Sequence, residues 1–353
     1  MTTSASTPAR VSPRPATPIL SLGRAIERLQ TPDVFEAYSP LTGEPIFAVD
    51  LGADTRWPAE IALAIARESL AELPCPSVGL AQGLLAPAAE ALVSEFDAVV
   101  ATREELERIA GAVFARPLAS QSLAQLLRLS AGHSVHEGLV AESLVYATLQ
   151  AGPEFAGWLA ARPEPRPRAR PEGPAVRIER AEGRLELWLN RPEKRNAFSA
   201  EMRDALCEGL ALAVIDPSVE RVSLRGEGPV FCSGGDLDEF GTLPDPATAH
   251  AIRSTRHPAR LLHALEPRVD CVVQGACVGA GIELPAFATR VVARPDASFR
   301  LPELSMGLVP GAGGTVSLPR RIGRQRTAWL ALSGVAIDAE TALRWRLIDA
   351  IAP

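Results

Sequence analysis

A proline- and arginine-rich segment near the middle of the chain most strongly limits how this sequence folds. Residues 162–174 (RPEPRPRARPEGP) contain five prolines and four arginines. Proline lacks a backbone N–H and fixes φ, so such a segment is extended and disfavours a helix or a central strand. We therefore predict two folded parts, residues 19–161 and 175–353, joined by a linker at 162–174. A length of 353 residues suits two domains.

Composition limits the class of protein and its partners. Residues 1–18 are rich in Ser, Thr, Pro and Ala, which predicts a disordered tail. A transit peptide has a similar composition, but four prolines disfavour the amphipathic helix it needs. The net charge of −6 disfavours nucleic acid as a partner. No segment approaches the roughly 20 apolar residues of a membrane span, so we expect a cytoplasmic protein with reduced cysteines.

The first part is predicted to mix strands and helices. Thr102, followed by Glu105, is the signature of a helix start. The predicted strands are 46–51, 77–81 and 96–101, and the predicted helices are 58–70, 102–112 and most of 118–159, with a break near Gly132.

The second part alternates strands and helices. Ser199 is the expected N-cap of its first helix. The predicted strands are 176–180, 185–189, 219–225, 270–274, 289–293 and 298–300, and the predicted helices are 199–214, 326–333 and 339–345. This order predicts a layered α/β fold.

Three glycine-rich turns carry the most specific pattern in the chain. They are Phe231–Leu237 (FCSGGDL), Gly275–Glu283 (GACVGAGIE) and Gly307–Thr315 (GLVPGAGGT). Taken singly, each fits a tight turn that needs positive φ, and none is a dinucleotide fingerprint. His133 and His136 lack a third metal ligand nearby, so no metal site is predicted.

Taken together and in order, these turns resemble the crotonase (enoyl-CoA hydratase/isomerase) superfamily. The resemblance covers roughly residues 178–350, and it includes LNRPEKRNAFS at 189–199 and RLIDAI at 346–351. It implies that the second part is a crotonase-like ββα spiral domain that binds an acyl-CoA. It also sets the expectation of a homo-oligomer built from trimers.

The resemblance further implies an oxyanion hole formed by the backbone N–H groups of Ser233 and Ala280. Preorganised amides of this kind stabilise the negative charge that develops on a thioester oxygen. A helix expected to begin near Ala280 would add the positive end of its dipole, although Pro285 interrupts that helix early. Lys194 is expected to meet a phosphate of CoA. The residues expected to bind CoA or to make room for the thioester are Lys194, Ala197, Gly234, Gly235, Asp236, Leu237, Gly279, Gly281 and Gly311.

Glu283 and Glu303 match the two glutamates that hydratases of this family use for acid–base catalysis. Two carboxylates facing one water molecule can divide proton abstraction and proton donation, and shared burial would separate their pKa values. Each lies in an apolar run, GIELPAF or FRLPEL, which disfavours a solvated position. Glycoside hydrolysis also uses paired carboxylates, but it has no use for a CoA-type oxyanion hole.

We therefore expect an enzyme, a lyase that hydrates a 2-enoyl-CoA to a 3-hydroxyacyl-CoA. No metal or redox cofactor is expected, since coenzyme A is part of the substrate. The same enolate also serves double-bond isomerases, hydrolases and dioxygenases, so these remain alternatives. A third possibility is a non-catalytic acyl-CoA-binding protein.

The first part contains a second, weaker resemblance. Residues 123–162 are similar to the terminal helices that cover the acyl pocket in the family and normally follow the RLIDAI position. We hypothesise that residues 19–161 are a degenerate crotonase-like half whose helices cap the catalytic half, in the same chain or in a neighbour. The alternative is an unrelated α/β interaction domain.

Overall fold

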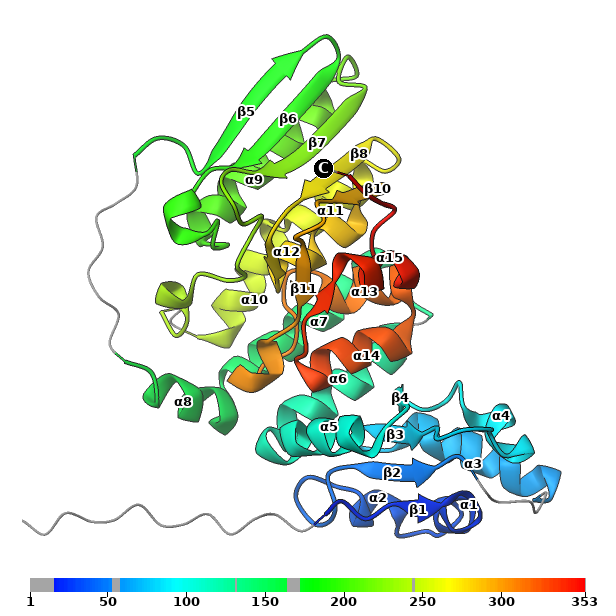
Figure 1. Cartoon of the computed structure of the whole chain (residues 1–353). Helices are drawn as coiled ribbons and strands as arrows, with labels where there is room; N and C mark the ends of the chain where they lie inside the picture. The colour runs from blue at the N-terminus through cyan, green and yellow to red at the C-terminus, as the bar shows by residue number, and fades with distance from the viewer. Residues whose placement is uncertain (1–15, 53–57, 131, 164–171, 243–244, 353) are drawn as a thin grey trace, which may run out of the picture.

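The computed structural model describes residues 16–52, 58–130, 132–163, 172–242 and 245–352. A lobe built around one sheet and a lobe with two sheets are joined by a layer of helices (Figure 1). Most of the predicted tail (1–15) and of the predicted linker (164–171) lies outside the described residues. No helix in the described ranges has both the length and the apolar character required to cross a bilayer.

The N-terminal lobe is a four-stranded parallel sheet in the order β1-β2-β3-β4. Its strands are β1 (Leu20–Ser21), β2 (Phe47–Asp50), β3 (Ser77–Leu80) and β4 (Ala98–Val100), and its helices are α1 (Leu22–Leu29), α2 (Val34–Ala37), α3 (Glu60–Glu72) and α4 (Pro87–Leu92). Side chains alternate between the two faces of the sheet. Phe47 and Val49 pack with α1, α3 and α4, while Ile46 and Ala48 join a core that continues into the second half. The three predicted strands are confirmed, and β1 was missed.

Four helices form the layer between the lobes. They are α5 (Arg103–Ala115), α6 (Pro117–Ser130), α7 (Val135–Gln150) and α8 (Pro153–Ala160). Thr102 and Ser134 begin α5 and α7 with complete capping boxes. In the same chain, α5 and α6 pack against α14, and α6 and α7 pack against α13 (Figure 1). One hydrophobic core therefore runs from the first sheet into the second half.

The second half contains a six-stranded sheet in the order β13-β10-β8-β7-β6-β5 and a three-stranded sheet in the order β12-β11-β9. Within these sheets only the pairs β5–β6 and β11–β12 are antiparallel. The strands are β5 (Val176–Ala181), β6 (Arg184–Leu189), β7 (Arg221–Gly226), β8 (Val269–Val273), β9 (Ala276–Val278), β10 (Arg290–Ala293), β11 (Ser298–Arg300), β12 (Ile337–Asp338) and β13 (Ala350–Ile351). The α/β class predicted for this half is confirmed.

The helices of the second half cover the edges and faces of these sheets. They are α9 (Ala200–Ile215), α10 (Pro246–Thr255), α11 (Pro258–Ala264), α12 (Ala280–Glu283), α13 (Gly314–Ile322), α14 (Arg324–Ser333) and α15 (Ala339–Trp345). Ser199 caps α9 by accepting from the amide of Met202, as predicted. The helix at Ala280 is a single turn, and Pro285 begins the 3₁₀ helix η3 (Pro285–Phe287) directly after it. Proline cannot donate the next helical hydrogen bond, which explains the short length.

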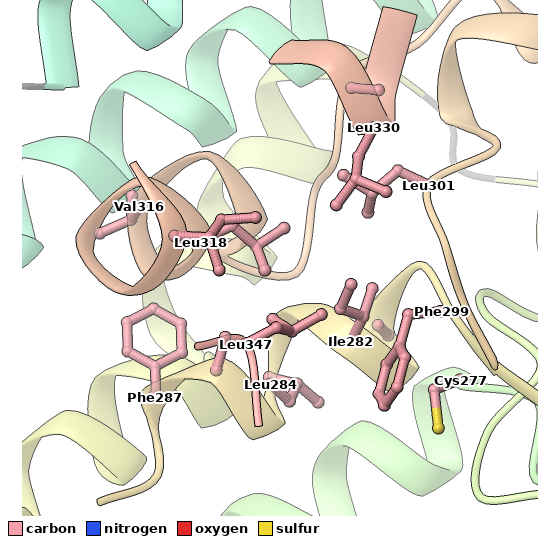
Figure 2. Close-up of a cluster of buried hydrophobic side chains, with 14 of the residues drawn as sticks. Cys277, Ile282, Leu284, Phe287, Phe299, Leu301, Val316, Leu318, Leu330 and Leu347 are labelled. Carbon is pink, nitrogen blue, oxygen red and sulfur yellow. The ribbon is translucent and has the colours of Figure 1, made fainter. Parts of the chain in front are cut away.

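An apolar core holds α12 against α13 (Figure 2). Ile282 and Leu284 flank the end of α12, and they lie among Phe299, Leu318 and Leu347, all of which are buried. Packing on this scale fixes the backbone of α12 to within small tolerances. This packing therefore also positions Glu283, which lies between Ile282 and Leu284.

A buried carboxylate ties the N-terminal lobe to the rest of the chain. Asp97 is 1% exposed and accepts from Arg128 of α6 at 2.9 Å and from Arg324 of α14 at 2.8 Å. The amide of Ser77 donates to its second oxygen at 2.8 Å. One anion thus satisfies guanidinium groups from both halves of the chain.

Replacing Asp97 with Ala should lower the free energy of unfolding by about 3 kcal/mol or more, because two partly buried cations lose their counter-charge. Urea unfolding measures this change. Asp33→Asn, which removes an exposed partner of Arg28, should cost less than about 1 kcal/mol. An Asp97 variant as stable as the Asp33 variant would contradict this account of the junction.

Candidate active site

Two buried glutamates face one small space between α12 and the 3₁₀ helix η4 (Glu303–Met306). Glu283 is 2% exposed and Glu303 is 8% exposed, and both line a cavity of about 410 Å³, here named the reaction cavity. A Cβ atom placed on Gly279 would lie 2.5 Å from Oε1 of Glu303 and 3.7 Å from Oε1 of Glu283. The structure therefore brings the two predicted acid–base residues together.

The two carboxyl groups differ in their hydrogen bonds. Oε2 of Glu283 accepts from the amide of Ala312 at 2.7 Å and from the amide of Gly314 at 2.9 Å. Oε2 of Glu303 is buried and has no hydrogen-bond partner among the described residues. Amide donors favour the ionised form of a carboxyl group, and a buried oxygen without a donor favours the protonated form.

Burial raises the pKa of both groups. The pKa of Glu303 is raised to about 8, first by burial and then by the charge of Glu142. The pKa of Glu283 is raised well above its usual value by burial and by Glu303 and Glu142, while its two amide donors oppose this shift. A coupled pair of this kind releases its protons in two separate steps. Near neutral pH, Glu283 and Glu303 can therefore hold one proton and one negative charge between them.

A third buried glutamate reaches the site from the N-terminal half. Glu142 of α7 is 1% exposed, and its two oxygens accept from the amides of Gly313 at 2.7 Å and Thr315 at 2.9 Å. With Glu283, it satisfies the amides of four consecutive residues, 312–315, at the start of α13. These amides have no partners inside the helix, and the helix dipole favours anions there. Burial nevertheless raises the pKa of Glu142 to about 7.

The two amides predicted to form the oxyanion hole differ in availability. Both Ser233 and Ala280 line the reaction cavity. The N–H of Ala280 has no acceptor among the described residues, whereas the N–H of Ser233 donates to the carbonyl of Arg195 at 3.0 Å. Arg195 and Asn196 have φ of 54° and 51°, a region that is unfavourable for residues other than glycine. One predicted donor is thus free and the other is engaged.

A second cavity, of about 800 Å³ and here named the outer cavity, adjoins the reaction cavity through Ser233, Gly235 and Leu237. Arg162, at the end of the helical layer, also lines it. The residues predicted to bind CoA that line the outer cavity are Lys194, Ala197, Gly235, Asp236 and Leu237.

Lys194 is not free to meet a phosphate as predicted. Its Nζ lies 2.8 Å from Oδ2 of Asp236 and 3.7 Å from Oδ2 of Asp238. The reason is that the Asp236 carboxylate is almost fully buried and needs a counter-charge. Lys194 provides that charge within the chain.

The predicted glycines make room mainly for protein atoms. A Cβ on Gly281 would lie 2.5 Å from the carbonyl oxygen of Cys232, and one on Gly311 would lie 2.4 Å from the ring of Tyr146. Gly279, with φ of +51°, makes room for Glu303. The protein atoms nearest to these positions are thus the Glu303 side chain for Gly279 and the Cys232 backbone for Gly281. Gly234, predicted to line the CoA channel, lines the reaction cavity and is not among the residues that line the outer cavity.

From the sequence, the helices of 123–162 were expected to cap the second half, but neither Glu142 nor Tyr146 of α7 was singled out. Leu139, Glu142, Tyr146 and Leu149 are all buried, at spacings of three and four residues that define one face of a helix. Glu142 stands at a position of this face where an apolar residue is expected. An acidic residue at such a position is the sequence pattern that indicates a buried carboxyl group. Trp158 of α8 also lines the reaction cavity.

Among the described residues, no three His, Cys, Asp or Glu side chains are grouped as metal ligands. His133 and His136 are both exposed.

The matches to known proteins cover about half of the chain. The model of the family described as Enoyl-CoA hydratase/isomerase matches residues 179–353. The 1,2-epoxyphenylacetyl-CoA isomerase of Escherichia coli K12 is 37% identical over 170 residues, which is 47% of this chain and 65% of that protein. The 2,3-dehydroadipyl-CoA hydratase of the same organism is 35% identical over 176 residues, which is 50% of this chain and 68% of that protein.

A crystal structure of enoyl-CoA hydratase from Thermoplasma volcanium GSS1 is 32% identical, with a TM-score of 0.47, and the match covers 51% of this chain and 72% of that one. The chain spans just under two thirds of the length of the first relative named above.

Glu303→Gln should become more stable than the wild type as the pH rises. The folded-state pKa of Glu303, about 8, lies above its ordinary value of 4.5, so the unfolded chain releases this proton first. Wild-type stability contributed by the protonated group is complete below pH 4.5 and is lost as the pH rises through 8. Between about pH 5 and pH 8.5, the variant should gain on the order of 3 kcal/mol relative to the wild type in urea unfolding. The exposed control Glu340→Gln should show no such trend, and an equal difference at both pH values for Glu303→Gln would refute the burial of this charge.

Proposed function

Because the chain belongs to the enoyl-CoA hydratase/isomerase family, we propose that it is a lyase that adds water across the double bond of a 2-enoyl-CoA to give a 3-hydroxyacyl-CoA. The observation that carries this proposal is the position of Glu283 and Glu303, whose carboxyl groups face one space beside Gly279. Hydration needs a base for the water and an acid for the α-carbon. The two glutamates supply one group for each role.

In the proposed reaction, Glu283 is the base, because two amides favour its charged form. It takes a proton from water, and the water oxygen bonds to the β-carbon. The π electrons of the double bond move toward the α-carbon and the thioester oxygen, which gives an enolate. Protonated Glu303 then donates to the α-carbon and the thioester re-forms. A proton passes from Glu283 to Glu303 before the next cycle.

The enolate oxygen needs hydrogen-bond donors. Ala280 N–H is unengaged and lines the reaction cavity, so it is the first donor in the proposal. Ser233 N–H becomes the second when the thioester oxygen takes the place of the Arg195 carbonyl. Each preorganised amide donor of this kind lowers the barrier by about 3 kcal/mol.

We assign the outer cavity to coenzyme A. Its volume of about 800 Å³ suits a large polar ligand, and it shares Ser233 with the lining of the reaction cavity. Arg195 and Arg162 line it, and Cζ of Arg162 lies 4.8 Å from the centre of the Trp158 ring. These groups suit the phosphates of CoA. The proposed reaction uses no metal or redox cofactor.

Double-bond isomerisation of an acyl-CoA is the second candidate. The description of the matching family, Enoyl-CoA hydratase/isomerase, names this type of activity as well. The same enolate and the same acid–base pair serve both reactions. Analysis of the product from a 2-enoyl-CoA separates them, since only hydration adds a water molecule.

Adding the purified protein to crotonyl-CoA should cause loss of the absorbance of the conjugated double bond. Glu303→Gln should lower the rate by about a hundredfold to ten-thousandfold, because the variant has no proton to donate to the α-carbon. Glu340→Gln, at an exposed position on α15, should leave the rate unchanged. Near-full activity in the Glu303 variant would reject its role as the acid.

Glu142→Gln should shift the high-pH limb of the rate profile to lower pH. This limb reports loss of the proton from Glu303, and the charge of Glu142 raises the pKa of both Glu283 and Glu303. Removing that charge lowers both pKa values. The measurement is kcat/KM against pH for the wild type and the variant, and an unmoved limb would show that Glu142 does not act on the pair.

A further inference from the structure

A cavity of about 330 Å³, here named the arginine cavity, lies beside the reaction cavity and has no part in the proposed hydration. Both are lined by Tyr146, Phe198, Phe240, Gly311 and Ala312. Because Ala312 also donates to Glu283, this shared wall borders the acid–base pair. None of these residues lines the outer cavity, which shares only Asp236 with the lining of the arginine cavity.

Three arginines line the arginine cavity, and they differ in their partners. Arg203 lies 2.8 Å from Asp204, and Arg256 lies 3.5 Å from Glu208. Arg253 has no carboxylate within 4.0 Å among the described residues. It is the arginine in this cavity whose charge is not balanced by an ion pair.

Neutral groups hold Arg253 in place. Its Nε donates to Oγ of Ser143 at 3.2 Å, and its Nη2 donates to Oε1 of Gln150 at 3.3 Å. Its Cζ lies 4.6 Å from the centre of the Tyr146 ring. The side chain is half-buried, and burial lowers its pKa, which reflects the cost of a poorly solvated cation. A guanidinium fixed in this way is preorganised to bind a planar anion.

A second group in the same cavity also lacks a partner. His257 is 8% exposed, and its buried Nδ1 has no hydrogen bond among the described residues. Burial and the nearby arginines lower the pKa of His257 to about 4, so the ring is neutral near pH 7. A neutral ring can offer an N–H to a ligand without adding charge.

The two acidic residues that line this cavity are already engaged. Asp236 is paired with Lys194 at 2.8 Å, and Oε2 of Glu239 accepts from the amide of Ala200 at 2.8 Å. Neither carboxylate forms an ion pair with Arg253. The space beside Arg253 therefore favours an anion from outside the chain.

We infer that the acyl chain of the substrate ends in a carboxylate, which binds Arg253 while the thioester lies in the reaction cavity. This inference rests on the proposed function and narrows its substrate class to dicarboxylic enoyl-CoA thioesters. The aromatic rings of Tyr146, Phe198 and Phe240 would contact the methylene groups between the two ends. A chain with an apolar end would leave Arg253 without an ion-pair partner among the described residues.

The test compares glutaconyl-CoA and its longer dicarboxylic homologues with their terminal methyl esters, which keep the chain length and remove the charge. For at least one length, kcat/KM should be about tenfold or more higher for the acid than for the ester. Arg253→Gln should lower kcat/KM for that acid by about tenfold to a hundredfold and change the value for the ester less than about threefold. The matched control Arg260→Gln removes an exposed arginine of α11 outside the cavity, and it should change neither value.

Two results would overturn the inference. The first is a wild-type kcat/KM for the acid that does not exceed the value for its ester at any chain length. The second is an equal loss of kcat/KM for acid and ester in Arg253→Gln, which would make Arg253 a structural residue.

Calorimetric binding of adipyl-CoA and hexanoyl-CoA to the wild type separates this inference from the hydration reaction. If adipyl-CoA binds more tightly than hexanoyl-CoA but no enoyl-CoA is hydrated, the proposed reaction is rejected and the carboxylate site is kept. If the two bind equally and crotonyl-CoA is hydrated, the carboxylate site is rejected and the proposed reaction is kept.

Discussion

The reaction centre depends on how the start of α13 satisfies its backbone amides. Residues 312–315 donate in alternation to Glu283 and Glu142, one from each half of the chain. A helix start buried without such acceptors would cost several hydrogen bonds. The interaction that completes α13 therefore also orients the carboxyl group of Glu283, the proposed base, and joins α7 to the second half. The same four hydrogen bonds cap the helix, join the two halves of the chain and hold Glu283 in place.

The hydrogen bonds at the start of α13 bring acidic groups together in a buried site, where the charged form of a carboxyl group is disfavoured. Glu142, Glu283 and Glu303 are all buried, and each has a raised pKa. The apolar packing around α12 in Figure 2 keeps these groups in position despite that cost. Proteins commonly accept a local loss of stability where a site needs reactive groups. Here the burial that costs stability also raises the pKa of Glu303, so this carboxyl group still holds a proton near neutral pH.

Much of the second half could be predicted from the sequence, because its signals are local. The family resemblance carried by the glycine-rich turns pointed to Glu283, Glu303 and Ala280, and Ser199 marked the start of α9. The Lys194 pairing, the Glu142 contacts and the engaged Ser233 amide were not predictable in this way. Each depends on a partner that is distant in sequence or on a loop conformation, such as the 171-residue separation between Glu142 and Gly313. The two-residue strand β1 was missed because it is too short to show a period.

The position of α7 before the catalytic half affects the order in which the protein can assemble during synthesis. A ribosome produces Glu142 and Tyr146 well before it produces the loop and helix that they contact. Until residues 311–315 have emerged, α7 exposes an apolar face that carries an acid without its amide donors. Contacts that span so much of the chain form late and favour slow folding. Apolar surface that waits for a later partner in this way is prone to aggregation while the chain is being made.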